Sequence, residues 1–400
     1  MNKFDYRQAV SKASNSNIGQ RLVRDDLKDM VPYQSARREV AGGINQHKTW
    51  LNANESGGSD SLDMSLADIN RYPDFQPQAL IQAYAHYAKL ASDHILATRG
   101  ADEGIDVLIR TFCRASADNI IICPPTYGMY SIAARSQNAG IISVPLKETD
   151  SGNMALDIAG LTEHINNARL VFICSPNNPT GGTVDLVDII EVLNLYQDTA
   201  LVVIDEAYIE YCPDTSVVSL LQQYPNLVVL RTLSKAFALA GLRCGFVLAH
   251  NNVIEQLSKV IAPYPIATPV ATIASQALMN VEIMTQRVEQ TIDQRKTLEA
   301  FLDQQPWLIK RYQSNTNYVL FKAQDASTLY QYFLEQGVVI RDQSKQLGLS
   351  QCLRVSVGTA DEMQQFYNAC LRSAGEQVLA AQSPNNIIQT QQDKRSTEDS

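Results

Sequence analysis

One asparagine, one aspartate and one lysine of this 400-residue chain each stand at or just beyond the end of a short apolar run. They are Asn178, Asp205 and Lys235. Continuous apolar runs of this length are typical of strands that are buried on both faces of a parallel sheet. The carboxyl ends of parallel strands meet at one edge, and ligands bind there. We therefore expect the amide, the carboxylate and the amine to lie close together.

These side chains meet the requirements of one coenzyme, pyridoxal phosphate. A desolvated lysine supplies a neutral amine that condenses with an aldehyde, and pyridoxal phosphate also needs a carboxylate at its pyridinium nitrogen and a donor at its phenolic oxygen. Lys235 and Asp205 fit the first two roles, while Asn178 and Tyr208 fit the third. Taken singly, these residues also fit a solvated ammonium, a helix cap and a turn. As a set they favour the coenzyme.

The chain also offers groups for the phosphate of the coenzyme. Ser234 precedes the lysine, Arg243 follows it, and residues 100–103 open a predicted helix whose free amides favour an anion. Arg243 alone would also fit an ion pair between domains. Tyr127 follows another apolar run, where its ring is suited either to stack on the pyridine ring or to pack in the core.

Alternating strand and helix patterns predict an α/β fold, with a mostly parallel sheet flanked by helices. The strand candidates are 119–123, 170–174, 200–204 and 227–230, and the clearest helix candidates are 78–90 and 102–114. From about residue 270 the pattern changes to a long amphipathic segment and strands at 318–321, 338–340 and 353–357, which predicts a smaller α+β domain. Thr359 and Glu362 have the spacing of a capping box at the start of a last helix.

The predicted organisation has four parts. They are an N-terminal segment (1–50), a large coenzyme-binding domain (51–268), a small C-terminal domain (269–375) and a polar, disordered tail (376–400).

Composition excludes several classes of protein. Hydrophobic residues make up 45% of the chain, and 33 basic against 42 acidic residues give a net charge of −9, so no basic field exists for nucleic acid. No apolar run is long enough to span a bilayer and no signal peptide pattern is present, which predicts a cytoplasmic protein without a membrane partner. The seven cysteines form no CxxC pair and the five histidines lack metal-ligand spacing, so we expect neither a metal site nor a disulfide framework.

The motifs together resemble a known family. Residues 178–181, 205–208 and 234–235, with Arg243 downstream, are similar to those of the class I/II aminotransferases of fold type I. Further stretches resemble the histidinol-phosphate aminotransferases within that family, from about residue 25 to about 375. These stretches are 32–38, 51–55, 71–74, 231–243 and 352–359.

The resemblance implies roles for individual residues. Lys235 would bind the coenzyme and act as the catalytic base, Asp205 would face the pyridinium nitrogen, and Asn178 and Tyr208 would contact the phenolic oxygen. The residues implied at the phosphate are Ala101, Asp102, Ser234, Arg243 and, from the other subunit of a homodimer with shared active sites, Tyr72. The residues implied at the substrate are Tyr33, Asn54, Arg341 and Arg354.

The implied reaction moves an amino group between L-histidinol phosphate and 2-oxoglutarate, giving imidazole acetol phosphate and L-glutamate in histidine biosynthesis. Two alternatives use the same fold: an aminotransferase for aromatic or other amino acids, and a decarboxylase of a phosphorylated amino acid. A coenzyme-binding regulator is less consistent with the sequence because no helix-turn-helix pattern is evident. A nicotinamide-dependent dehydrogenase would need a G-x-G-x-x-G fingerprint that this chain lacks.

Overall fold

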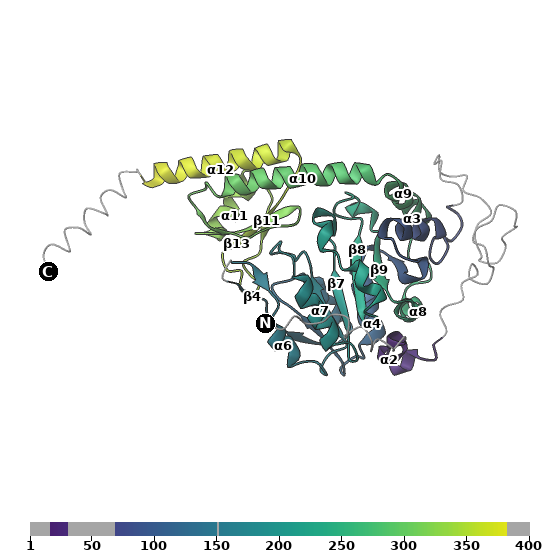
Figure 1. The fold of residues 1–400 in the computed structure, drawn as a ribbon. Coiled ribbons are helices and arrows are strands. Elements are labelled where there is room, and N and C mark those ends of the chain that lie inside the picture. The colour runs from purple at the N-terminus through teal and green to yellow at the C-terminus, as the bar shows by residue number, and fades with distance from the viewer. Residues whose placement is uncertain (1–16, 31–68, 150–151, 382–400) are drawn as a thin grey trace. The chain divides into compact units, whose positions relative to one another are not determined.

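The computed structural model describes residues 17–30, 69–149 and 152–381 (Figure 1). The chain forms two compact units: unit 1 comprises Met1–Asn178 with Gly182–Glu289, and unit 2 comprises Pro179–Gly181 with Gln290–Ser400. The domain limits expected from the sequence, with a boundary after residue 268, stay a prediction. The N-terminal segment 1–50 and the tail 376–400 lie largely outside the described residues.

Unit 1 is built on a seven-stranded sheet in the order β1-β9-β8-β7-β6-β2-β3. Strands β3, β2, β6, β7 and β8 are mutually parallel, and β9 runs antiparallel to both of its neighbours, β1 and β8. The strands are β1 (Ile95–Thr98), β2 (Asn119–Ile122), β3 (Gly140–Ser143), β6 (Leu170–Cys174), β7 (Leu201–Asp205), β8 (Leu227–Thr232) and β9 (Gly245–Ala249). A separate two-stranded ribbon consists of β4 (Lys147–Glu148) and β5 (Met154–Ala155). All four strand candidates of the larger predicted domain, and with them the α/β fold class, are confirmed.

Helices alternate with the strands of this sheet in the sequence. The α-helices of unit 1 are α2 (Ile18–Leu22), α3 (Gln78–Ala88), α4 (Gly100–Phe112), α5 (Met129–Ser136), α6 (Ile158–Thr162), α7 (Leu186–Leu195), α8 (Asn251–Val260) and α9 (Thr268–Met279). Short 3-10 helices are η2 (Asp25–Leu27), η3 (Ser92–His94), η4 (Ile209–Tyr211), η5 (Pro213–Thr215), η6 (Val218–Gln222) and η7 (Ala240–Leu242). Figure 1 shows α4 alongside β8 and β9, which it contacts.

Helix α4 illustrates why this sequence folds onto the sheet. Ile105, Leu108 and Phe112 recur at helical spacing, so they fall on one face of the helix. All three are at most 1% exposed and belong to the same core cluster as Leu230 of β8 and Val247 of β9. Packing of this face on β8 and β9 places the first turn of α4 at the end of the sheet where β8 ends.

Unit 2 has an antiparallel four-stranded sheet in the order β10-β11-β13-β12. Its core contains Trp307, Phe321, Phe333 and Phe366. The elements are β10 (Leu308–Arg311), β11 (Tyr318–Ala323), β12 (Arg341–Asp342), β13 (Cys352–Ser356), α11 (Ala326–Glu335) and α12 (Ala360–Ala381). Helix α10 (Val281–Leu302) contributes its residues from Gln290 onward to this unit.

The strand predicted at 338–340 is wrong. The Val338 amide donates to the Phe333 carbonyl at 2.8 Å, and Gly337 has φ +76°, so both residues close the C-terminus of α11. An amide used in this way cannot join a ladder. The strand β12 therefore begins only at Arg341.

The predicted capping box is confirmed at the start of α12. The Thr359 amide donates to Glu362 Oε2 at 2.7 Å, and the Glu362 amide donates to Thr359 Oγ1 at 3.3 Å. These reciprocal bonds satisfy amides that have no partner within the helix. The Thr359 amide and hydroxyl, which both donate to Glu362 Oε2, also lower the pKa of Glu362.

We expect Thr359→Ala to lower the free energy of unfolding by about 1 kcal/mol, because a cap is lost. The measurement is urea denaturation followed by circular dichroism. Thr297→Ala is the matched control, since the Thr297 hydroxyl only donates to the Asp293 carbonyl within α10. The loss should shrink as the pH falls through the lowered pKa of Glu362, where that carboxylate gains a proton. Equal losses in both variants would contradict this role.

Three further observations concern the described residues. None of their helices is long and apolar enough to cross a membrane. No group of three or more of their His, Cys, Asp and Glu side chains could hold a metal ion. The cysteines are free thiols, and all are buried except Cys212, which is partly exposed.

Candidate active site

Four chain segments of unit 1 reach the same edge of the sheet. Asp205 is the last residue of β7 and lies beside Cys174, the last residue of its parallel neighbour β6. Gly245, the first residue of β9, pairs with both Thr98 and Thr232, which are the last residues of β1 and β8. The segments that follow these strands therefore begin at one edge, as the sequence predicts.

The Asp205 carboxylate is almost completely buried at this edge, with 2% of the residue exposed. Its Oδ2 accepts a hydrogen bond from the Tyr130 hydroxyl at 2.6 Å, and its Oδ1 accepts one from the Ala207 amide at 3.1 Å. Burial raises the pKa of Asp205 to about 6, although both hydrogen bonds lower it. No ion pair to Asp205 occurs among the residues that the structure describes. The charge of this carboxylate could therefore be balanced by a cationic ligand.

Lys235 lies in the loop that follows β8. Its Nζ is 5.5 Å from the centre of the Tyr208 ring, which follows β7. The loop is closed by a hydrogen bond from the Leu239 amide to the Leu233 carbonyl at 3.1 Å. The charge of Lys235 also lowers the pKa of Asp205, although less than the two hydrogen bonds do.

A second cluster joins the start of α4 to the loop before β9. Asp102 accepts hydrogen bonds from the Tyr127 hydroxyl at 2.9 Å and from Arg243 Nη2 at 3.2 Å. A second guanidinium nitrogen, Nη1, donates to Ser234 Oγ at 3.4 Å. The structure thus brings together one guanidinium, one hydroxyl and the N-terminus of a helix of 13 residues, a combination suited to a phosphate.

Gly100 makes this arrangement possible. Its φ of +76° is unfavourable for other residues, and a Cβ atom there would lie 2.8 Å from Arg243 Nη2. A side chain at this position would displace the guanidinium. Gly100, the first residue of α4, therefore lies directly beside Arg243, and Ala101 follows it in the first turn of the helix.

Asn178 lies in the loop that follows β6, next to a residue that fixes that loop. The side-chain Nδ2 of Asn177 donates to the Pro125 carbonyl at 2.9 Å, and the Thr126 hydroxyl donates to Asn177 Oδ1 at 3.1 Å. These bonds connect the loop after β6 to the loop after β2, which carries Tyr127. Asn178 and Tyr127 are thereby held in adjacent loops.

A buried ionic cluster underlies the Asp205 and Lys235 loops. Arg231 of β8 forms an ion pair with Glu206 at 2.6 Å and a longer one with Glu210 at 3.7 Å. Its Nη2 also donates to Ser216 Oγ at 2.9 Å. Glu206 follows Asp205 directly, so this cluster connects the chain after β7 to the strand that leads to Lys235.

The remaining predicted residues belong to other parts of the fold or lie outside the described residues. The Tyr72 ring stacks on Tyr264 with ring centres 4.6 Å apart. Arg341 and Arg354 belong to unit 2, where they face each other across β12 and β13, and the Arg354 guanidinium lies 4.7 Å from the centre of the Tyr318 ring. The remaining predicted substrate residues, Tyr33 and Asn54, lie outside the described residues.

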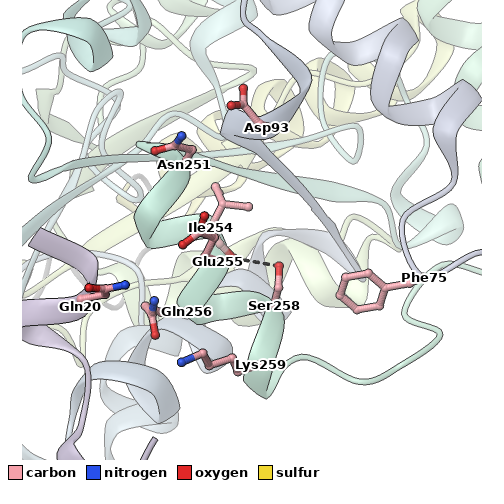
Figure 2. Close-up of a pocket in the computed structure, with 9 residues that line it drawn as sticks. All are labelled: Gln20, Phe75, Asp93, Asn251, Ile254, Glu255, Gln256, Ser258 and Lys259. Atoms are coloured by element: carbon pink, nitrogen blue, oxygen red, sulfur yellow. Dashed lines mark hydrogen bonds between the residues drawn. The ribbon is translucent and has the colours of Figure 1, made fainter. Parts of the chain in front are cut away.

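A pocket of about 550 Å³ lies elsewhere on unit 1, and most of its lining comes from α8 (Figure 2). Lys259 Nζ already donates to the carbonyls of Leu27 and Lys28, and the Ser258 hydroxyl donates to the Ile254 carbonyl. The lining residues are Gln20, Phe75, Asp93, Asn251, Ile254, Glu255, Gln256, Ser258 and Lys259. None of them is a predicted site residue, so this pocket is separate from the chemistry at the sheet edge.

Comparison with known families identifies the chain. The family of class I and II aminotransferases matches residues 47–369. The chain belongs to this aminotransferase family. The resemblance found in the sequence is thereby confirmed, and the family is one that depends on pyridoxal phosphate.

Relatives of this aminotransferase are similar over most of its length. A histidinol-phosphate aminotransferase from Colwellia psychrerythraea is 51% identical over 358 residues, which cover 86% of this chain and 97% of the relative. One from Salmonella typhi is 46% identical over 350 residues, which cover 87% and 95%.

Solved structures agree with the fold of this aminotransferase. The histidinol-phosphate aminotransferase from Clostridium acetobutylicum is 25% identical, with a TM-score of 0.71, and the match covers 77% of this chain and 92% of that one. The enzyme of the same name from Sinorhizobium meliloti was solved in complex with pyridoxal-5'-phosphate. It is 22% identical, with a TM-score of 0.70, and the match covers 77% of this chain and 84% of that one.

Reasoning from the sequence missed the supporting residues of this aminotransferase site. Tyr130 is one of them: it lies in α5 only three positions after Tyr127, but Tyr127 precedes that helix, so no helical spacing links the two in the sequence. The buried partners Arg231, Glu206 and Glu210 were also missed. In the sequence, the only indication of these buried residues is that they are charged residues within or next to apolar runs.

Proposed function

We propose that this chain transfers an amino group between L-histidinol phosphate and 2-oxoglutarate, giving imidazole acetol phosphate and L-glutamate in histidine biosynthesis. The relatives that are 45–51% identical over most of the chain support this reaction. The observation that carries the chemistry is the buried Asp205 carboxylate, which has no ion pair among the described residues and lies within electrostatic reach of Lys235. A carboxylate and an amine in this relation fit pyridoxal phosphate as coenzyme.

When bound, pyridoxal phosphate supplies an aldehyde for amines and a cationic ring that withdraws electrons from the substrate Cα. Asp205 would face the ring nitrogen and keep it protonated, and that cation would favour the ionised form of Asp205. Lys235 would hold the coenzyme through its aldehyde, and its Nζ would take up the proton released at the substrate Cα. Asn178 and Tyr208 would donate hydrogen bonds to the phenolic oxygen, and Tyr127 would stack on the ring.

The cluster at the start of α4 would hold the phosphate of the coenzyme. Arg243 and Ser234 would supply a guanidinium and a hydroxyl, and Ala101 and Asp102 would supply amides of the first helical turn. The Asp102 carboxylate is itself occupied by Arg243 and Tyr127, which supports a positioning role for it.

Substrate recognition involves residues outside this cluster. Arg341 and Arg354 bind the substrate phosphate and the carboxylate of glutamate, since guanidinium groups suit both anions. Tyr33 and Asn54 contribute further contacts. In a homodimer with shared active sites, Tyr72 reaches the phosphate of the partner's coenzyme, and its 48% exposure is compatible with such an interface. The cytoplasmic location expected from the sequence stays a prediction.

The half-reaction with L-histidinol phosphate tests this function. Adding that amine to the coenzyme-loaded protein should convert the bound aldehyde to pyridoxamine phosphate, seen as a loss of its visible absorbance. L-phenylalanine and L-aspartate at the same concentration should react at least about tenfold more slowly. Carbon dioxide release from a phosphorylated amino acid, without formation of pyridoxamine phosphate, would contradict the proposal and favour a decarboxylase.

A further inference from the structure

Tyr130 is the nearest hydrogen-bonding side chain to the buried Asp205 carboxylate. It lies near the start of α5, has no exposed surface, and donates its hydroxyl to Asp205 Oδ2 at 2.6 Å. Its ring stacks on Phe172 of β6 with centres 4.8 Å apart and contacts Tyr127 edge-on at 5.7 Å. Two aromatic contacts and one short hydrogen bond therefore fix the orientation of the hydroxyl.

We propose that Tyr130 is a positioning residue that fixes the Asp205 carboxylate and keeps it charged for the coenzyme nitrogen. The inference rests on the proposed function, because that function makes Asp205 the partner of the ring. Tyr130 does not itself contact substrate or reacting atoms in this proposal. It acts through Asp205.

The electrostatic surroundings of Asp205 explain why such a donor is needed. Burial disfavours the carboxylate and raises its pKa, and the Asp102 carboxylate adds to this effect. The Tyr130 hydrogen bond opposes burial most strongly, followed by the Ala207 amide and then by the charge of Lys235. The titratable groups that face Asp205 are Asp102 on α4, Tyr127 after β2, Tyr130 on α5, Cys174 on β6 and Lys235 after β8.

The other acidic hydrogens of this cluster remain bound near neutral pH. Burial raises the pKa of Tyr130, Tyr127 and Cys174, in each case with a further increase from the charge of Asp205. The Cys174 thiol donates to the Pro176 carbonyl at 3.3 Å instead of to Asp205. Asp205 is thus the group in this cluster whose charge the Tyr130 hydroxyl controls.

The test uses the protein without coenzyme and compares Tyr130→Phe with Tyr196→Phe. Tyr196 is the matched control because it is also fully buried in unit 1 and its hydroxyl donates to the Leu161 carbonyl at 2.6 Å. The free energy of unfolding of each variant is measured between about pH 4.5 and pH 8. Wild-type stability should fall as pH rises toward about 6, because folded Asp205 holds its proton more tightly than unfolded Asp205.

Removing the Tyr130 hydroxyl should raise the pKa of folded Asp205 by about one unit or more, because a hydrogen bond to a charged group is lost. The loss of stability in Tyr130→Phe should then grow as pH rises above about 6, whereas the loss in Tyr196→Phe should be constant with pH. In an Asp205→Asn background the pH-dependent part of the Tyr130→Phe effect should disappear. A pH-independent loss in Tyr130→Phe, or the same growth in both single variants, would overturn the proposal.

Tyr130→Phe could also fail to fold near neutral pH. If the cause is a buried Asp205 carboxylate that has lost its hydrogen-bond donor, folding should return in mild acid or in an Asp205→Asn background. Absence of rescue in both cases would show a packing defect and reject the inference.

Binding of pyridoxal phosphate gives a second and separate readout. Tyr130→Phe should raise the dissociation constant of the coenzyme by about tenfold and lower kcat more than it changes the KM for L-histidinol phosphate. Tyr196→Phe should change neither by more than about twofold. If the wild-type protein bound no coenzyme, the proposed function would be wrong. The unfolding measurements without coenzyme would still test whether Tyr130 controls the charge of Asp205. If coenzyme binding and activity were normal but Tyr130→Phe behaved like Tyr196→Phe, the inference alone would fail.

Discussion

Replacing Lys235 with alanine is expected to abolish transamination while the fold stays intact. Under the proposed function the variant loses both the amine that would bind the coenzyme aldehyde and the base that would take the substrate Cα proton. Loss of the proton transfer alone should lower kcat by about 10²- to 10⁴-fold. Glutamate formation from L-histidinol phosphate and 2-oxoglutarate measures the rate, and circular dichroism together with thermal unfolding checks the fold.

Lys147→Ala is the control for loss of a lysine from the same unit. Lys147 Nζ pairs with Asp157 at 2.7 Å, and 64% of its side chain is exposed, so little stability and no activity should depend on it. A small added amine should restore part of the activity of Lys235→Ala, because it supplies the missing base. Wild-type activity in Lys235→Ala, or an equal loss in Lys147→Ala, would contradict the assigned mechanism.

Replacing Arg231 with methionine is expected to cause the largest loss of stability. Arg231 is 7% exposed, Glu206 is 1% exposed and Glu210 is 8% exposed. Its removal leaves two buried carboxylates without their cation, which costs about 3–5 kcal/mol. Chemical denaturation at about pH 8 measures the loss in the free energy of unfolding.

The loss in Arg231→Met should depend on pH in a defined direction. Burial raises the pKa of Glu210 from 4.5 to about 7 in the folded protein, and the charge of Arg231 opposes this rise. Folded Glu210 therefore binds its proton more tightly than unfolded Glu210, and its ionisation lowers stability as pH rises through this interval. Removing Arg231 enlarges the effect, so the variant should be closer to wild type at about pH 5 than at pH 8.

Arg110→Met provides the comparison for an exposed ion pair. Arg110 Nε lies 2.8 Å from Asp106, and both side chains are about 40% exposed. Its removal should lower the free energy of unfolding by less than about 1 kcal/mol. Equal losses in Arg110→Met and Arg231→Met would mean that burial of the Arg231 cluster is unimportant for stability.

Local patterns in the sequence were sufficient for several elements. The strands β2, β6, β7 and β8 could be predicted from their continuous apolar runs, because a strand that is buried on both faces does not alternate between apolar and polar residues. The Thr359 and Glu362 capping box is also local, since both partners lie within one helical turn. The strand expected at 338–340 failed because the Val338 amide is used by the preceding helix.

Sheet order and strand direction came only from the tertiary structure. Strand β9 lies between β1 and β8 and runs antiparallel to both, although its sequence is as apolar as that of the parallel strands. Apolar side chains determine that a strand is buried, but they do not determine its direction or its neighbours. Those are decided by the packing of the whole unit.

The sequence by itself determined which residues could do the chemistry, because Asn178, Asp205 and Lys235 stand where strands end. The tertiary structure decided which side chains support them. Tyr130 lies 75 residues from Asp205 in the chain, and Arg231 lies 25 residues from Glu206. A buried polar group must find a partner in space, and the order of strands in the sheet selects that partner regardless of distance along the chain.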